Sequence, residues 1–116
     1  MGIIEKMRLD GKKGFVTGAA RGIGKCTATA FAEAGADVAI VDLDLAEARK
    51  TAEEIAGETG RKVIAVGTDC TDPKQVDEMV AQVVRELGGL DFCHNNAGIC
   101  INAPAEEMTY AQWLKV

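Results

Sequence analysis

No apolar run in this sequence of 116 residues approaches the roughly 20 residues that a transmembrane helix needs. The start, MGIIEKMRLDG, has too short an apolar stretch for a signal peptide, and Lys6 stands where a myristoylation motif has Ser or Thr. The basic residues form no stripe and the formal net charge is −5, so the surface repels phosphate backbones. These absences argue against membrane and nucleic-acid partners and predict a cytoplasmic protein.

Recognisable metal-binding and disulfide patterns are also missing. The four cysteines, Cys26, Cys70, Cys93 and Cys100, follow no CxxC spacing, and three of them lie in or at the ends of apolar segments. We therefore expect small buried hydrophobic residues rather than disulfides or metal ligands. His94 is the single histidine. A zinc site with Cys93 and Cys100 would lack a fourth ligand, so we interpret His94 as a strand residue.

What the sequence does contain is a regular alternation of strand and helix signals. Hydrophobic residues make up 47% and charged residues 27%, which is typical of a soluble globular protein with one domain, residues 1–116. Short β-branched apolar runs predict strands, and longer segments with apolar residues at helical spacing predict helices. The expected strands are 12–17, 37–42, 62–69 and 90–95, and the expected helices are 23–35, 45–60 and 73–87.

Strands separated by helices of this length predict an α/β fold, a Rossmann-type doubly wound parallel sheet. The strands are apolar throughout rather than alternating, as expected of a sheet covered on both faces. Ligands of such sheets bind beyond the carboxyl ends of the strands. The glycine turn, Asp42, Asp69 and residues 95–98 all follow strand ends, so we expect one edge of the sheet to collect them.

The glycine turn lies in FVTGAARGIGK, between a strand and a helix. At Gly18, Gly22 and Gly24 the missing side chains let backbone N–H groups approach a phosphate, and the start of the helix attracts negative charge. A glycine-rich turn alone is weak evidence, because glycines also serve as plain turn residues. The segment is therefore a candidate pyrophosphate site that needs support from its surroundings.

The second strand supplies that support with Asp42, 18 positions after Gly24. A carboxylate at this place accepts both hydroxyls of an adenosine ribose and repels a 2′-phosphate, which favours NAD over NADP. Arg21 argues for NADP, since a guanidinium beside the turn pairs well with phosphate. Leu43 offers no second cation, so we expect NAD, with Arg21 solvated or packed over the adenine.

Taken together, TGAARGIG, the aspartate after the second strand, TDCTD after the third and NNAGI after the fourth resemble the short-chain dehydrogenase/reductase family, in its ordinary form of roughly 250 residues. The resemblance covers nearly the whole sequence from Arg8 onward and implies the strand order 3-2-1-4. It also implies that the cofactor contacts come from one set of positions. These are Thr17, Gly18, Arg21, Gly22, Ile23, Gly24, Asp42, Leu43, Asp69, Cys70, Asn96, Ala97 and Gly98.

Within that set the resemblance implies three groups of contacts. The backbone from Gly18 to Gly24, with Thr17, matches the pyrophosphate turn, and Asp42 matches the ribose ligand. Asp69 and Cys70 match the pair that flanks the adenine, by side chain and by backbone respectively. Residues 96–98 match the segment beside the ribose and nicotinamide. An alternative role for Asn96 is to tie the fourth strand to its neighbours.

The activity that the resemblance implies is NAD-dependent hydride transfer with a small alcohol or carbonyl substrate, by a homo-oligomer. The family's catalytic Asn, Ser, Tyr and Lys belong to a second half that this sequence does not contain, and no catalytic or metal-binding residue is assigned here. Tyr110 and Lys115 are five positions apart and would point about 140° away from each other on a helix. We expect instead that Thr109 caps this helix and that Trp113 packs it onto the sheet.

The fourth strand has an interior place in the family's sheet, so a fifth strand should lie beside it. As a free edge, this apolar strand favours self-association of the 116-residue chain. The sequence is therefore predicted to be part of a longer enzyme. The alternatives are a stand-alone nucleotide-binding module and a structural fragment without affinity for nucleotides.

Overall fold

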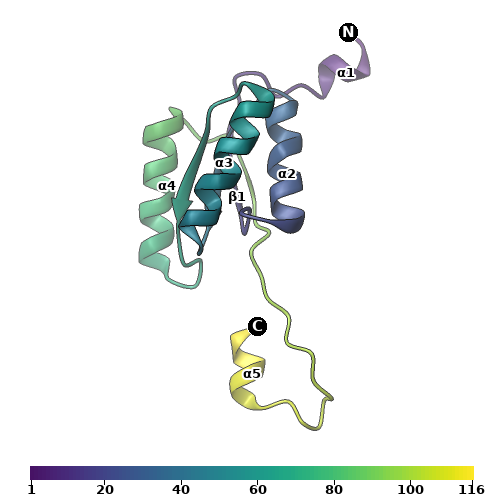
Figure 1. Cartoon of the computed structure of the whole chain (residues 1–116), viewed down its shortest axis with the longest axis vertical. Coiled ribbons are helices and arrows are strands. Elements are labelled where there is room, and N and C mark those ends of the chain that lie inside the picture. The colour runs from purple at the N-terminus through teal and green to yellow at the C-terminus, as the bar shows by residue number, and fades with distance from the viewer.

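A four-stranded parallel sheet forms the centre of the protein (Figure 1). The computed structural model describes all residues, 1–116. The strand order is β3-β2-β1-β4, as predicted. The strands are β1 (Lys13–Thr17), β2 (Asp37–Asp42), β3 (Val63–Gly67) and β4 (Phe92–His94). β4 contains His94 as predicted, but it is shorter than expected because it pairs with β1 over three residues only.

Three long helices cover the two faces of this sheet (Figure 1). Helices α2 (Gly22–Glu33) and α3 (Leu45–Thr59) lie on one face, and α4 (Pro73–Leu87) lies on the other. Two short helices, α1 (Ile3–Lys6) and α5 (Tyr110–Lys115), lie at the two ends of the chain. The arrangement is the doubly wound architecture that the alternating sequence pattern predicts.

Local sequence signals explain where α3 and α4 begin and end. Asp44 accepts a hydrogen bond from the N–H of Glu47, and Asp72 accepts one from the N–H of Lys74, so each aspartate caps a helix. The cap residue at the other end of each helix is a glycine in the left-handed region, with φ 70° at Gly60 and 87° at Gly88. These caps therefore fix where the two crossover helices begin and end.

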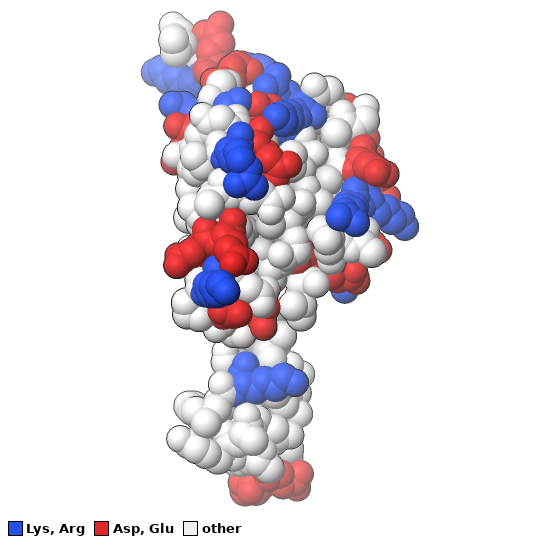
Figure 2. All heavy atoms as spheres, turned by 90° about the vertical axis from the view of Figure 1, so that its left-hand side faces the viewer, with Lys and Arg blue, Asp and Glu red and all other residues white.

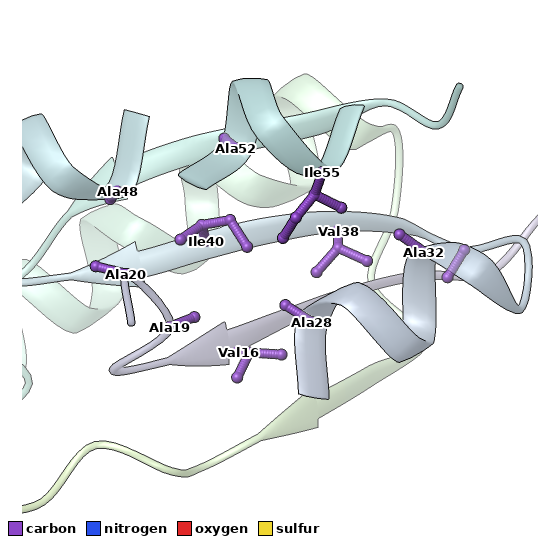
Figure 3. Close-up of a cluster of buried hydrophobic side chains, with 11 residues drawn as sticks. Val16, Ala19, Ala20, Ala28, Ala32, Val38, Ile40, Ala48, Ala52 and Ile55 are labelled. Atoms are coloured by element: carbon purple, nitrogen blue, oxygen red, sulfur yellow. The ribbon is translucent and has the colours of Figure 1, made fainter. Parts of the chain in front are cut away.

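The core on the α2 and α3 side is built largely from alanines (Figure 3). Ile40 and Val38 of β2 and Ile55 of α3 fill its centre, and alanines surround them. Small side chains let the two helices approach the strands closely, which supports dense packing. The cluster comprises Val16, Ala19, Ala20, Ala28, Ala32, Ala36, Val38, Ile40, Ala48, Ala52 and Ile55.

A second core cluster lies on the α4 side of the sheet. Its helix residues, Met79, Val83 and Leu87, are spaced along one face of α4 and are almost fully buried. They pack against side chains from the other face of β1, β2 and β3, namely Phe15, Ala39, Val41 and Val66. Successive residues of β2 therefore enter opposite clusters, so this strand is buried on both faces, which explains its continuous apolar sequence.

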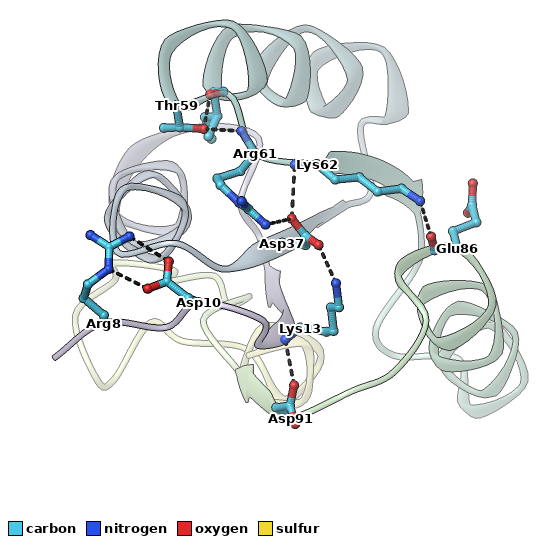
Figure 4. Close-up of polar contacts among 10 residues, drawn as sticks. Arg8, Asp10, Lys13, Asp37, Thr59, Arg61, Lys62, Glu86 and Asp91 are labelled. Carbon is cyan, nitrogen blue, oxygen red and sulfur yellow. Dashed lines mark hydrogen bonds and ion pairs between the residues drawn. The ribbon is translucent and has the colours of Figure 1, made fainter. Parts of the chain in front are cut away.

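Ion pairs and hydrogen bonds join the amino ends of the strands around Asp37, whose side chain is only 8% exposed (Figure 4). Lys13 and Arg61 form ion pairs with its two carboxylate oxygens, and the N–H of Lys62 donates to it at 3.2 Å. Burial opposes ionisation of Asp37, but these hydrogen bonds outweigh it and hold the pKa of the carboxyl below its usual value. The candidate site residues lie at the opposite end of the sheet, beyond the carboxyl ends of the strands.

The structure corrects the prediction that the four cysteines are buried. We expected small buried residues, but Cys26, Cys70, Cys93 and Cys100 are all exposed and carry free thiols. Cys26 lies on the outer side of α2, and Cys93 lies on the edge strand β4, which has a neighbour on one side only. An apolar neighbourhood in the sequence therefore does not bury a residue whose element is covered on one side.

The segment after β4 leaves the body of the protein and ends in α5 (Figure 1). Thr109 caps α5 as predicted, with its hydroxyl accepting from the N–H of Gln112 at 3.1 Å. The prediction that Trp113 packs onto the sheet is wrong, because its side chain is on a helix held away from the sheet and is 71% exposed. None of the helices has the length and apolar character needed to cross a lipid bilayer.

Candidate functional site

The glycine turn links the carboxyl end of β1 to α2, and its glycines have distinct structural roles. A Cβ atom on Gly24 would lie 2.4 Å from the carbonyl oxygen of Gly18 and 2.7 Å from Nδ2 of Asn96. Gly22 has φ 63°, and a Cβ there would meet no atom within 4 Å. Gly24 therefore allows close packing of the turn, whereas Gly22 faces open space and leaves room for a ligand.

The amino end of α2 differs from those of α3, α4 and α5, because no side chain caps it. Arg21 stands at the cap position in an extended conformation, and its side chain makes no hydrogen bond to the first turn. The first N–H groups of a helix need partners and carry partial positive charge. Gly22, Ile23 and Gly24 supply these groups at the place where a phosphate would bind, and the side chain of Ile23 is 77% exposed beside them.

Asp42 at the end of β2 is held by two backbone groups. The N–H of Ala20 donates to Oδ2 at 3.1 Å, and the N–H of Asp44 donates to Oδ1 at 3.0 Å. The carboxylate is thereby fixed between the glycine turn and the start of α3. Each carboxylate oxygen retains acceptor capacity after one hydrogen bond. The carboxylate can therefore still accept hydroxyl groups from a ligand at this edge.

An ion pair spans the same two segments. The guanidinium of Arg21 lies 3.0 Å from Oδ2 of Asp44, with both side chains largely exposed. The backbone N–H of Glu47 and the guanidinium of Arg21 hold the pKa of Asp44 below its usual value. Leu43, between the two aspartates, is 76% exposed and brings no charge. The Arg21 side chain is therefore solvent-exposed, as expected, and is paired with Asp44.

Residues 96 and 97 are joined to the end of β1 by four hydrogen bonds. The hydroxyl of Thr17 accepts from the N–H of Asn96 and from the N–H of Ala97, each at 3.0 Å. The side-chain amide of Asn96 donates to the carbonyls of Thr17 at 3.1 Å and Gly18 at 3.3 Å. Asn96 thus ties the segment after β4 to the glycine turn, the alternative role considered above. Ala97 and Gly98 follow it at the open edge, both exposed.

Asp69 and Cys70 begin the loop after β3. The hydroxyl and N–H of Thr71 donate to Oδ1 of Asp69, which lowers the pKa of this carboxyl. Partial desolvation raises the pKa of the Cys70 thiol, and the charges of Asp69 and Asp42 raise it further. The loop starts beside the end of β2, because the N–H of Thr68 donates to the carbonyl of Asp42 at 3.0 Å.

Three features of this edge were not identified from the sequence. Asp44 holds Arg21, although an aspartate before a helix predicts only a cap. Thr68 is 4% exposed and its hydroxyl has no hydrogen-bond partner. A hollow of about 240 Å³ lies on the α4 side of β1, where no single motif indicates it. Its lining residues are Phe15, Thr17, Cys70, Val76, Met79, Asn95 and Ala97.

A family profile described as short chain dehydrogenase matches residues 12–116. The chain belongs to this family. Among its curated relatives, the sorbitol dehydrogenase of Cereibacter sphaeroides is 44% identical over 103 residues, covering 89% of this chain and 39% of the relative. The galactitol 2-dehydrogenase of Agrobacterium fabrum is 44% identical over 110 residues, covering 95% of this chain and 41% of the relative.

Solved structures of short-chain dehydrogenases share the fold. One from Mycobacterium marinum superposes with a TM-score of 0.93 at 38% identity, covering 98% of this chain and 46% of that chain. One from Burkholderia cenocepacia, solved in complex with NADP, gives a TM-score of 0.83 at 40% identity, covering 90% and 43%. This short-chain dehydrogenase sequence spans about two fifths of the length of the two curated relatives named above.

The residues at the carboxyl ends of the strands have three features that suit a bound dinucleotide. The amino end of α2 is uncapped, Gly22 faces open space, and Asp42 has acceptor capacity left. A nicotinamide dinucleotide carries an anionic pyrophosphate and a ribose with two hydroxyls, which match the first and third features in charge and hydrogen bonding. No group of three or more His, Cys, Asp or Glu side chains is placed to hold a metal ion.

Proposed function

We propose that residues 1–116 form the dinucleotide-binding domain of an NAD-dependent short-chain dehydrogenase that oxidises an alcohol or reduces a carbonyl compound. The observation that carries the proposal is the Asp42 carboxylate, held at the sheet edge by the N–H groups of Ala20 and Asp44. The two N–H groups fix its orientation before any ligand arrives. A preorganised acceptor of this kind costs little ordering free energy when two ribose hydroxyls bind it.

The other site residues have supporting roles in this proposal. The N–H groups of residues 22–24 would hold the pyrophosphate at the start of α2, and Gly18 and Gly24 would keep the turn closely packed. Asp69 and Cys70 would flank the adenine, and residues 96–98 would lie beside the ribose and nicotinamide. Thr17 would act through Asn96 and Ala97, because its hydroxyl accepts hydrogen bonds from both of their N–H groups.

The preference for NAD over NADP rests on charge. Asp42 and Asp44 place two carboxylates at the carboxyl edge of β2, and Arg21 is paired with one of them. A 2′-phosphate added to the ribose would meet net negative charge there, which is unfavourable. The NADP complex of the Burkholderia relative shows that a family member with this fold binds NADP, so the two cofactors have to be compared directly.

In the proposed reaction, the bound nicotinamide supplies the hydride acceptor or donor. This part of the enzyme would contribute the position of the cofactor, and the acid–base residues would come from the rest of the protein. Tyr110 and Lys115 both lie exposed on α5 and take no part in the proposal. We therefore expect residues 1–116 alone to bind the dinucleotide without turning over substrate.

Polyols are the first substrates to test, because three relatives at 40–44% identity are a sorbitol, a galactitol and a D-threitol dehydrogenase. A cyclohexanol dehydrogenase at 38% identity makes simple cyclic alcohols the second class.

We also propose a cytoplasmic homo-oligomer. The four exposed free thiols suit a reducing compartment.

The test is an assay of the full-length protein with a panel of sugar alcohols and cyclic alcohols, each with NAD⁺ and with NADP⁺, following formation of the reduced nicotinamide. We expect turnover of at least one alcohol with NAD⁺ at higher kcat/KM than with NADP⁺. Direct titration of the protein with NAD⁺ separates cofactor binding from the choice of substrate. Absence of any NAD⁺ binding would overturn the proposal. Binding without turnover would instead show that the substrate belongs to another chemical class.

A further inference from the structure

The ion pair between Arg21 and Asp44 connects the glycine turn to the amino end of α3. Its two atoms are 3.0 Å apart. The same two segments also hold Asp42, through the N–H groups of Ala20 and Asp44. Arg21 directly follows Ala20 in the chain, so the guanidinium is attached next to one of the two groups that fix the Asp42 carboxylate.

The cations near this point are already engaged. Lys25, one helical turn after Arg21, pairs with Glu54 at 2.7 Å. Leu43 brings no charge to the edge. Arg21 is therefore the cation on the glycine turn that a phosphate group at the ribose would meet, and in this structure it is paired with Asp44. A guanidinium released from such a pair can bind phosphate with two hydrogen bonds.

We propose that Asp44 is a positioning residue for cofactor choice: it holds Arg21 in an ion pair and so withholds it from the 2′-phosphate of NADP. The inference rests on the proposed function, because it assigns a second determinant to the same cofactor site. Asp42 acts on the ribose hydroxyls themselves. Asp44 acts only through the position and charge of Arg21.

Asp44 uses its two carboxylate oxygens for different tasks, and this makes a clean test possible. Oδ1 accepts from the N–H of Glu47 at 3.1 Å and caps α3, whereas Oδ2 binds Arg21. Asparagine caps helices as well as aspartate does, through its remaining oxygen. In Asp44→Asn the cap is kept, and the carboxylate oxygen that faces Arg21 is replaced by an NH₂ group, which repels a guanidinium.

The experiment is a double-mutant cycle in the full-length protein, with wild type, Asp44→Asn, Arg21→Gln and the double variant titrated calorimetrically with NAD⁺ and with NADP⁺. We expect Asp44→Asn to raise NADP⁺ affinity roughly three- to tenfold, with NAD⁺ affinity changed by less than about twofold. In the Arg21→Gln background the same substitution should give no gain, because the cation that it releases is absent.

The matched control is Glu53→Gln, which removes an exposed carboxylate of α3 that forms no ion pair and changes the net charge by the same amount. It should leave the ratio of NADP⁺ to NAD⁺ affinity unchanged. Three results would overturn the inference: no gain in Asp44→Asn, a gain that persists without Arg21, or an equal loss of both affinities. A wild-type protein that binds neither dinucleotide would overturn the proposed function itself, and the inference with it.

Discussion

At the scale of single residues, Asp42 carries the largest functional prediction. Its carboxylate is oriented by two backbone N–H groups and has acceptor capacity left for a ribose. Replacing Asp42 by Arg removes the hydroxyl acceptor and adds a partner for a 2′-phosphate. Because hydrogen bonds to charged groups contribute about 1.5–3 kcal/mol, we expect NAD⁺ affinity to fall by roughly 10- to 100-fold and the preference to move toward NADP⁺.

The measurement is the ratio of dissociation constants for the two cofactors, compared between Asp42→Arg and Glu53→Arg. Glu53 is an exposed residue of α3 away from the amino end of that helix, so its variant carries the same charge reversal without touching the site. A preference for NAD⁺ that survives Asp42→Arg would show that the ribose is bound by other groups.

Two glycines in helices allow opposite predictions for one substitution. In Gly24→Ala the new Cβ would lie within 2.9 Å of Ala19, Asn96 and the Gly18 carbonyl, so the glycine turn must shift. We expect a loss of about 1–3 kcal/mol in the free energy of unfolding, together with weaker dinucleotide binding. Gly57 lies within α3 on its exposed side, and a Cβ atom at this position would have no neighbour within 4 Å.

In Gly57→Ala the better helix former should therefore stabilise the protein by roughly 0.5–1 kcal/mol and leave cofactor binding unchanged. Urea unfolding and a cofactor titration of both variants decide the matter. If Gly24→Ala matched the Gly57→Ala variant in stability, the close contact at the turn would not constrain residue 24.

At the scale of elements, the amino ends of β1, β2 and β3 are held together through Asp37. Its pKa is lowered in the folded protein, so its contribution to stability is complete above the unfolded value of about 3.9 and is lost as the pH falls through the folded value. In Asp37→Asn, Lys13 and Arg61 lose their shared carboxylate. Because both cations are partly solvated, we expect a loss of about 2–3 kcal/mol at neutral pH, less than for a fully buried pair.

The check is the urea midpoint of wild type and Asp37→Asn between about pH 7 and about pH 3. The two curves should approach each other as the pH falls, because wild type then loses the charge that the variant lacks. Arg8→Gln, which removes the exposed pair with Asp10, is the control and should lie close to wild type throughout. A gap between wild type and Asp37→Asn that is constant with pH would exclude ionisation of Asp37 as its source.

Elements with their own start and stop signals were predicted closely from the sequence. Asp72 with Pro73 begins α4 and Gly88 ends it, and the apolar run of β2 has the predicted bounds. β4 was predicted too long because its length depends on its partner β1 rather than on its own residues. The same reasoning applies at the site: the turn and Asp42 are visible as local patterns, whereas the pair between Arg21 and Asp44 joins segments 23 positions apart.

At the scale of the whole molecule, the C-terminal segment contrasts with the body. Charged side chains are spread over the body, whereas the surface of the extension in Figure 2 is mostly uncharged. Trp113, Leu114 and Val116 are 71%, 64% and 69% exposed. Exposed apolar groups on one short helix form a patch that favours contact with other apolar surface. The sheet does not cover α5 in this structure, which is why the prediction that Trp113 packs onto the sheet was wrong.

The last prediction concerns the 116-residue chain studied by itself. β4 pairs only with β1, so one side of an apolar strand is open, and α5 presents its apolar residues to solvent. Both features favour self-association, which sedimentation velocity should detect as a mean mass that rises with concentration.

The double variant Trp113→Ser with Leu114→Ser should shift this rise to higher concentration. Ile3→Ser with Ile4→Ser removes similarly exposed apolar residues of α1 and should change it less, because the Trp113 side chain offers more apolar area than an isoleucine does. A monodisperse monomer at all concentrations would show that neither the open edge of β4 nor the exposed apolar surface of α5 drives association.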